Sequence, residues 1–160
     1  MTIRLTLDEF YEQFQETDEE QLQWDALDER DITYKFDTRI SNGWRREIEL
    51  REGLRLFIDR HQQRERLVIK NPEQENHKIY CGFMLSGKGR VVFTSILSDV
   101  EVSQTTGKYY IETNGISFES IDDYLDVEPC SFVEIEMKPE ILRSFAASPV
   151  RELPNILQHL

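Results

Sequence analysis

Short segments in which apolar and polar residues alternate run through the middle of the chain. From Trp44 onward, apolar residues recur at every second position, and turns that contain Gly separate one segment from the next. A period of two is that of a β-strand, whose successive side chains point to opposite faces of a sheet. The pattern therefore predicts a series of strands, each with an inner and an outer face. The predicted strands cover residues 44–51, 54–61, 67–70, 77–85, 90–94, 108–113, 116–119 and 130–137, with a short edge strand near 32–36.

Two pairs of these strands carry the turn signals of hairpins. Residues 86–89, Ser-Gly-Lys-Gly, separate strand 77–85 from strand 90–94. Asn114-Gly115 stands between the strand that begins at Lys108 and the one that ends at Glu119. Such Gly-containing turns predict that the flanking strands pair with each other.

Helices are predicted at both ends of the chain. Thr6 and Glu9 have the spacing of a capping box, and apolar residues then follow at helical spacing, which predicts an amphipathic helix over residues 7–21. Pro139 occupies a favourable first helical position and predicts a helix through Ala147. After a break at Ser148-Pro149, a further apolar-periodic segment runs to the end of the sequence.

Several evenly spaced short strands and Gly turns predict a mainly β fold with flanking helices, specifically a cupin-like jelly-roll barrel. We expect an N-terminal helix and acidic lead-in over 1–40, the β-barrel over 41–137, and a C-terminal helical segment for dimerisation or linkage over 138–160. Because the sequence stops within a predicted helix, we expect a fragment, or a linker whose next domain is absent. Whether the chain is a natural full-length product stays open.

The charge of the chain is concentrated near its start. Residues 1–31 hold eleven acidic residues against Arg4 and Arg30, which gives −9 of the formal net charge of −12. Phosphate backbones are bound by clustered Lys and Arg, so direct binding of nucleic acid by this chain is not expected. The acidic run is interpreted as a solvated surface. No apolar run is long enough to span a membrane, and the N-terminus lacks a secretion signal, so we expect a cytoplasmic protein.

The chain lacks the residue spacing of the common catalytic sites. A metal-binding cupin needs two His one residue apart on a strand, whereas His61, His77 and His159 are isolated. Ser86 lacks the sequence context of a nucleophile, and the turn around it lacks the spacing of a phosphate-binding loop. We therefore expect no catalytic residue, no metal site and no cofactor.

Two acidic residues of the last strand leave an alternative open. Glu134 and Glu136 share one face and could form an acid/base pair, but we expect them to form the solvated side opposite Val133 and Ile135.

What remains is a binding cavity inside the barrel. Trp44 and Arg46 share a strand face with Ile48, so if that aliphatic side chain points inward, an indole and a guanidinium point inward too. A guanidinium can hold a carboxylate through two hydrogen bonds. The alternative is that these side chains only fill the barrel and Arg46 reaches solvent. The predicted ligand-binding residues are Trp44, Arg46, Cys81, Phe83, Phe93 and Tyr109.

Four motifs resemble a known family. IELREGLRLFIDRH, FMLSGKGR, PEILRSF and ELPNILQHL, in this order, resemble the N-terminal portion of AraC-type bacterial transcription regulators, in particular the branch similar to pyochelin-type siderophore regulators. The resemblance implies a cupin-like effector and dimerisation domain that binds a small molecule, with a ferric siderophore as the implied ligand. It also implies a homodimer, and DNA contact only through a C-terminal helix-turn-helix domain that this chain lacks.

The hypothesis that follows is a cytoplasmic ligand-sensing domain without catalytic activity. Two alternatives stay open: a stand-alone, metal-free cupin-like enzyme, and a dimerisation module whose barrel is filled.

Overall fold

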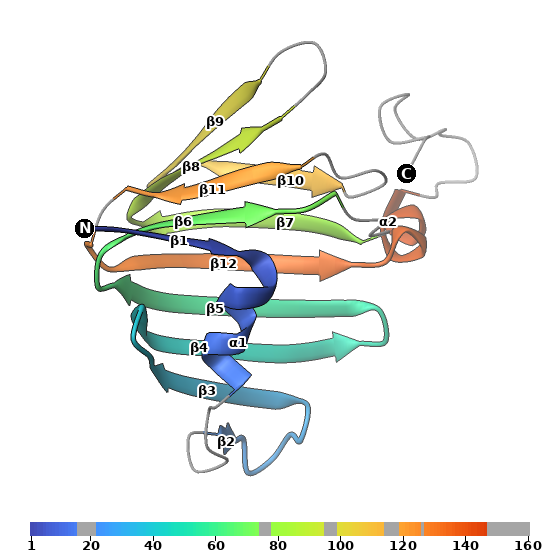
Figure 1. Cartoon of the computed structure of the whole chain (residues 1–160). Helices are drawn as coiled ribbons and strands as arrows, with labels where there is room; N and C mark the ends of the chain where they lie inside the picture. Colours follow the sequence, from blue (N-terminus) through green and yellow to red (C-terminus); the bar gives the residue numbers. More distant parts are fainter. Residues whose placement is uncertain (16–21, 74–77, 95–98, 114–118, 126, 147–160) are drawn as a thin grey trace.

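In the computed structural model, the chain forms two β-sheets that face each other, with one helix after the first strand and one after the last (Figure 1). The structure describes residues 1–15, 22–73, 78–94, 99–113, 119–125 and 127–146. The five-stranded sheet has the order β1-β6-β11-β8-β9, and the seven-stranded sheet has the order β10-β7-β12-β5-β4-β3-β2. The strands of the first sheet are β1 (Thr2–Thr6), β6 (Arg66–Asn71), β8 (Lys88–Phe93), β9 (Val100–Thr105) and β11 (Ser120–Tyr124). Those of the second are β2 (Leu22–Trp24), β3 (Asp31–Asp37), β4 (Ser41–Arg51), β5 (Leu54–Gln63), β7 (Ile79–Ser86), β10 (Tyr109–Thr113) and β12 (Cys130–Met137). The helices are α1 (Leu7–Gln15) and α2 (Pro139–Ala146).

The predicted mainly β fold with flanking helices is confirmed, and the strands with the clearest alternation form the centre of the larger sheet. β5 pairs antiparallel with β4 on one side and with β12 on the other. The turn between β4 and β5 requires Gly53, whose φ of 77° is unfavourable for residues with a side chain. Aliphatic residues at alternate positions suit such central strands because their side chains pack against those of the paired strands on the same face.

One predicted hairpin is wrong, and the return strand of the other falls largely on residues that the structure does not describe. β7 lies in the seven-stranded sheet and β8 in the five-stranded sheet, so the turn between them carries the chain from one sheet to the other. Gly87 makes this crossing with a φ of 92°, and a Cβ on it would lie 3.0 Å from Cα of Cys130. β10 pairs with β7, whereas the next described strand, β11, pairs with β6 and β8. Residues 114–118, which carry the second predicted turn and most of its predicted return strand, lie outside the described residues.

Four strands were not predicted: β1, β2, β9 and β11. β11 contains Asp122 and Asp123, and because Asp is rare in strands, the sequence pattern did not indicate a strand here. In the structure, two guanidinium groups compensate the second of these carboxylates: Arg66 donates to Asp123 at 2.6 Å and Arg90 at 2.8 Å. The ion pairs therefore permit an acidic strand in the middle of the smaller sheet.

Helix α1 begins as predicted, at a capping box. The backbone N–H of Thr6 donates to a carboxylate oxygen of Glu9 at 2.8 Å, and the N–H of Glu9 donates to the Thr6 hydroxyl at 3.3 Å. The helix is described to Gln15, and the rest of its predicted length lies outside the described residues. Its apolar side packs on a buried cluster. The cluster consists of Ile40, Leu67 and Ile69, and the residues packed against it include Leu7 and Phe10.

Neither described helix is long and apolar enough to cross a membrane.

The apolar face of the larger sheet points away from the smaller sheet, opposite to the predicted direction. The inner face of β10 carries Tyr110 and Glu112, whereas Tyr109 is 77% exposed and Ile111 62% exposed on the outer face. Adjacent strands continue this outer face because paired residues share a side. We call it the outer face, and it consists of Tyr109, Ile111, Cys81, Phe83, Val133, Ile135, Leu56 and Ile58.

Candidate functional site

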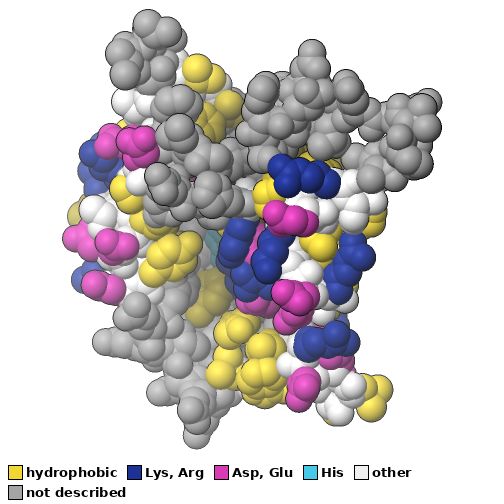
Figure 2. Space-filling view, turned by 90° about the vertical axis from the view of Figure 1, so that its right-hand side faces the viewer, with side chains coloured by type: hydrophobic (Ala, Val, Ile, Leu, Met, Phe, Trp, Pro, Cys, Tyr) yellow, Lys and Arg dark blue, Asp and Glu magenta, His cyan; other side chains and the backbone are white. Residues whose placement is uncertain are grey.

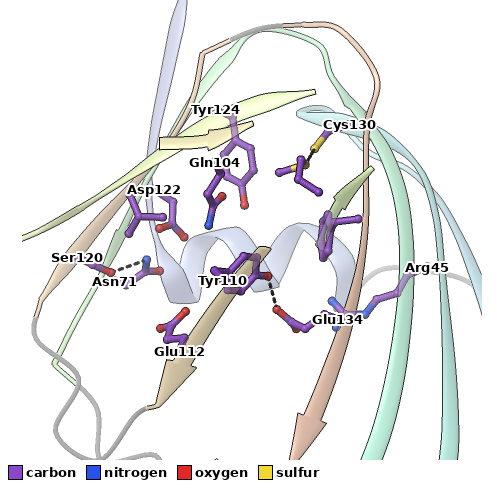
Figure 3. A pocket seen from close by; sticks show the side chains of 13 residues that line it. Arg45, Asn71, Gln104, Tyr110, Glu112, Ser120, Asp122, Tyr124, Cys130 and Glu134 are labelled. Atoms are coloured by element: carbon purple, nitrogen blue, oxygen red, sulfur yellow. Dashed lines mark hydrogen bonds between the residues drawn. The ribbon is translucent and has the colours of Figure 1, made fainter. Parts of the chain in front are cut away.

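A cavity of about 210 Å³ lies between the two sheets (Figure 3). Side chains from eight strands line it, so both sheets contribute to its wall. From the larger sheet these are Arg45, Met84, Tyr110, Glu112, Cys130, Phe132 and Glu134, and from the smaller sheet Asn71, Val91, Gln104, Ser120, Asp122 and Tyr124. Most of them carry a group that can donate or accept a hydrogen bond or carry a charge. The cavity is therefore suited to a polar ligand.

Tyr110 extends across one wall of the cavity and its hydroxyl donates to Oε2 of Glu134 at 2.6 Å (Figure 3). Its ring covers the backbone of Gly82, the residue opposite it on β7. A Cβ on Gly82 would lie 2.1 Å from the ring Cζ, which is far closer than atoms can approach. A glycine is thus required here because the aromatic ring occupies the space of a side chain.

Three carboxyl groups line the cavity, and burial raises the pKa of each. The pKa of Glu112 rises through burial and then through the nearby Asp122 and Glu134. Burial also raises the pKa of Asp122, against a hydrogen bond from Asn71 that lowers it. For Glu134, burial outweighs the hydrogen bond from Tyr110. Like charges in a space shielded from water repel, so the three groups resist ionising together.

Arg45 lies next to Glu134 at one side of the cavity (Figure 3), where its charge acts to lower the pKa of Glu134, and it is held by two contacts. Its guanidinium lies 4.2 Å from the centroid of the Phe57 ring, and its Nε lies 3.8 Å from a carboxylate oxygen of Asp59. Asp59 is 5% exposed, and burial, together with Glu134 and Glu47, raises its pKa to about 6 although Arg45 opposes the shift. The guanidinium is thus already partly neutralised within the protein.

None of the six predicted ligand-binding residues lies among those that line the cavity. Trp44 and Arg46 flank the lining residue Arg45 on β4, and Arg46 pairs with Asp31 at 2.5 Å. Tyr109 adjoins the lining residue Tyr110 and points outward. Cys81 and Phe83 flank Gly82 on the outer face of β7, and Phe93 pairs with the lining residue Ser120 at the cavity's margin. Their role in ligand binding stays a prediction.

On β4, β7 and β10, a residue that lines the cavity is the immediate sequence neighbour of a predicted ligand-binding residue. Sequence reasoning placed the aliphatic side of each strand inward, which follows from the usual burial of apolar residues. Here the interior holds a polar cavity, so Arg45, Tyr110 and Glu112 point inward instead. The charged residues between the aliphatic ones were the signal that could have indicated a polar interior.

The expectation that Glu134 and Glu136 form a solvated side is wrong. Glu134 lines the cavity, and Glu136 is buried between Arg55 at 2.5 Å and Lys78 at 3.0 Å. Burial alone would raise the pKa of Glu136, but these two cations lower it below its ordinary value. Figure 2 shows one face of the molecule, on which basic and acidic side chains likewise lie next to one another.

The one described histidine lies inside the sandwich and does not belong to a metal site. His61 stands edge-on to Tyr124 and Phe132, with ring centroids 6.0 and 5.9 Å away. Burial lowers the pKa of His61 to about 4, so its imidazole is neutral at pH 7. Across the described ranges, no group of three or more His, Cys, Asp and Glu side chains is arranged to hold a metal ion. His77 and His159 lie outside the described residues.

Two facing sheets around a cavity define a jelly-roll of the cupin type, as predicted, although the sheets stay separate and do not close into a continuous barrel. Solved structures of similar shape include cupins. A cupin domain from Bordetella pertussis is 15% identical over 64% of this chain and 99% of its own, with a TM-score of 0.41. A cupin superfamily protein from Desulfitobacterium hafniense is 9% identical over 64% of this chain and 84% of its own, with a TM-score of 0.44. Bacillus subtilis oxalate decarboxylase is 13% identical over 71% of this chain, which spans 34% of that enzyme, with a TM-score of 0.47.

The sequence itself identifies the family. Residues 42–160 match the family described as the regulatory protein PchR N-terminal domain. Since the match covers most of the chain, the chain belongs to this family of regulatory domains, which confirms the predicted resemblance. The comparison with curated proteins found no match to the chain.

Proposed function

We propose that the chain is the ligand-sensing and dimerisation domain of an AraC-type transcription regulator, which binds a small molecule between its sheets without transforming it. The cavity carries the proposal, because it lies in a member of a regulatory family and its wall is built from both sheets. A ligand bound there would contact both sheets at once. Its binding would therefore favour one arrangement of the sheets over others, which is what transmission of a signal requires.

In this proposal, DNA is bound by a separate helix-turn-helix domain of the same regulator, acting in the cytoplasm. The net charge of −12 makes these 160 residues themselves a poor partner for phosphate groups. Helix α2, which follows β12 directly, stands at the point where the chain leaves the larger sheet and would lead toward that domain.

The outer face supports the proposed homodimer. It presents eight uncharged side chains on four neighbouring strands, in a chain that otherwise carries a large negative charge. In a symmetric dimer the same surface meets its own copy, so a patch without charge avoids repulsion between like groups. An exposed apolar surface of this kind is typical of a protein interface.

For the ligand, the resemblance implies a ferric siderophore. The cavity volume of about 210 Å³ lies below the range of about 300–1,000 Å³ that is usual for ligand pockets. A ferric siderophore would therefore require the sheets to separate, whereas a smaller polar molecule would fit the cavity as it stands.

Thermal unfolding tests the proposal. A ligand that binds only the folded state raises the melting temperature as its concentration rises. We expect a ligand among ferric pyochelin and small polar metabolites to do so, and Gln104→Ala and Ser120→Ala to reduce the shift because both residues line the cavity. Trp44→Ala and Arg46→Ala test instead the two residues of β4 that were predicted from the sequence to bind the ligand. Loss of the shift only in this second pair would overturn the cavity as the site.

A metal-free cupin-like enzyme is the second candidate, and the Tyr110–Glu134 pair favours it. A buried carboxyl group whose pKa is raised by burial, hydrogen-bonded to a phenol at 2.6 Å, can pass a proton to a bound molecule. Mass spectrometry of the ligand after prolonged incubation with the protein separates the two functions: a sensor returns the ligand unchanged, whereas an enzyme converts it and Tyr110→Phe stops the conversion.

A further inference from the structure

We infer that the ligand is amphipathic, with a polar head group in the cavity and an apolar chain or ring on the inner face of β8 and β9. The inference rests on the proposed function, because it names the chemical class of the molecule that the domain senses. It depends on apolar side chains that point toward the interior of the sandwich and yet are exposed to solvent.

β8 and β9 present apolar residues on the face that borders the cavity. Val91 on β8 lines the cavity and is paired with Val102 on β9, so both side chains lie on the same face. Gln104 also lines the cavity, which shows that this is the inner face of β9. Because the strand period is two, Phe93 and Val100, which are paired with each other, lie on this face as well. We call Phe93, Val100 and Val102 the apolar strip.

Ion pairs on the opposite face agree with this orientation. Arg90 on β8 contacts Glu101 on β9, with the guanidinium nitrogen and the carboxylate oxygen 3.3 Å apart. The same guanidinium donates to Asp123 on β11 at 2.8 Å. Since neighbours along a strand point to opposite faces, the apolar side chains next to Arg90 and Glu101 face inward.

The apolar strip is uncovered, unlike the same face of the smaller sheet beside α1. Val100 is 53% exposed and Val102 is 40% exposed, although both point inward. On β6, by contrast, the inward side chains Leu67 and Ile69 are fully buried, because residues of α1 pack against them. Neither α1 nor α2 covers β9, the outermost strand of the smaller sheet (Figure 1). The inner face of this sheet is therefore covered at one side and bare at the other.

The ligand itself is the molecule that fits the apolar strip. The strip is continuous with the cavity, because Val102 is paired with the lining residue Val91 and is followed two positions later by the lining residue Gln104. The cavity of about 210 Å³ is smaller than the usual ligand pocket of about 300–1,000 Å³, so a ligand of usual size extends beyond it. An apolar part that extends along the strip would remove exposed aliphatic surface from water, which stabilises the complex.

The same sheet supplies groups for the polar head. Asn71 on β6 donates to the hydroxyl of Ser120 on β11 at 3.1 Å, and both residues line the cavity with Gln104 of β9. Figure 3 shows these three side chains at the side of the cavity that the smaller sheet forms. Their amide and hydroxyl groups can both donate and accept hydrogen bonds. Ser120 is also paired with Phe93, so the groups for the head lie next to the apolar strip.

Calorimetric titration with a homologous series tests the inference. The probes are methyl, butyl, hexyl and octyl β-D-glucoside, which share one uncharged polar head and differ in the length of the apolar chain. Each is used below the concentration at which micelles form, and ferric pyochelin is titrated in parallel.

The variant combines Val100→Thr with Val102→Thr, which keeps the shape and the strand preference of both side chains. Val127→Thr is the matched control, because Val127 is similarly exposed but lies between β11 and β12. The melting temperature of each variant without ligand shows whether the fold is retained.

We expect octyl glucoside to bind the unaltered protein at least about tenfold more tightly than methyl glucoside, because each buried methylene group strengthens binding. The double variant should bind octyl glucoside about fivefold more weakly, and the control should bind it as the unaltered protein does.

The inference is overturned if neither octyl glucoside nor ferric pyochelin binds more weakly to the double variant than to the control, because the apolar part of the ligand then lies elsewhere. If methyl glucoside or ferric pyochelin still binds in that case and Gln104→Ala weakens the binding, the sensor proposal stands without the apolar strip. If no probe binds, both proposals fail.

Discussion

The ring of Tyr110 lies where the side chain of residue 82 would be in most strands. Because residue 82 is glycine, the phenol can lie flat on β7 and reach Glu134 on the next strand. A methyl group at Gly82 would meet ring atoms of Tyr110 at 2.1 to 2.3 Å. The shape of one cavity wall thus depends on the absence of a side chain on the neighbouring strand.

Gly82→Ala should therefore displace Tyr110 and destabilise the fold. Overpacking of this kind typically costs about 1–3 kcal/mol of the free energy of unfolding, which urea denaturation measures. Tyr110→Ala in the same chain removes the clash, so the double variant should recover part of the loss. Gly89→Ala is the matched control, because a Cβ there would lie 3.5 Å from its nearest neighbour. Equal effects of the two glycine substitutions would contradict this account of the wall.

The helix starts and most strands of the larger sheet could be predicted because their local signals agree with their final environment. The capping box of Thr6 and Glu9, the turn at Gly53 and the helix start at Pro139 each act within a few residues. The pairing of β7 with β10 and of β11 with β6 depends on contacts between residues far apart in the sequence, which local turn signals do not contain.

Which face of each strand points toward the interior could not be predicted, for a related reason. Periodicity shows that a strand has two different faces, but it does not show which face meets the interior. On β10, Tyr109 and Ile111 form the more apolar face and yet point outward, since Tyr110 and Glu112 line a polar cavity. A shift of one residue therefore exchanges the candidates for the site on β4, β7 and β10.

Asp123→Asn should destabilise the smaller sheet by about 2 kcal/mol at pH 7, because it removes the charge that two guanidinium groups share in a buried position. Hydrogen bonds from Arg66 and then Arg90 lower the pKa of Asp123 below its value in the unfolded chain. Stability from this carboxylate is thus complete above the unfolded pKa of about 3.9 and disappears as the pH falls through the lower folded pKa.

Urea denaturation at pH 7 and at pH 3 should therefore show a difference between variant and unaltered protein that narrows in acid. The control is Asp37→Asn, which removes an ion pair with Arg64 at a carboxylate that is 73% exposed and should change stability little. A loss at Asp123 no larger than that at Asp37 would show that the buried ion pairs do not stabilise β11.

Asp59 should show the opposite dependence on pH. Burial raises its pKa to about 6, above the value of about 3.9 in an unfolded chain, so the folded state binds the extra proton between these two values. Stability then falls as the pH rises from about 4 to about 6, and the cost is complete above that range. Asp59→Asn removes this cost and should raise the free energy of unfolding by about 1–2 kcal/mol at pH 7 but not at pH 4. Thermal unfolding across this range measures the effect, and a variant that is less stable at pH 7 would show that the ionised carboxylate is held favourably by Arg45.

The outer face gives the sharpest test of the proposed homodimer. Ile111 is 62% exposed at the centre of an edge strand, so Ile111→Glu should leave the monomer folded while placing two like charges in an interface formed by two copies of this face. Sedimentation velocity should then show a dimer for the unaltered protein and at least about tenfold weaker association for the variant. Leu27→Glu is the control, since Leu27 is 98% exposed in the connection between β2 and β3, away from this face. If both variants associate as the unaltered protein does, the outer face is not the interface, because a pair of glutamates buried within it would cost more than such an interface could compensate.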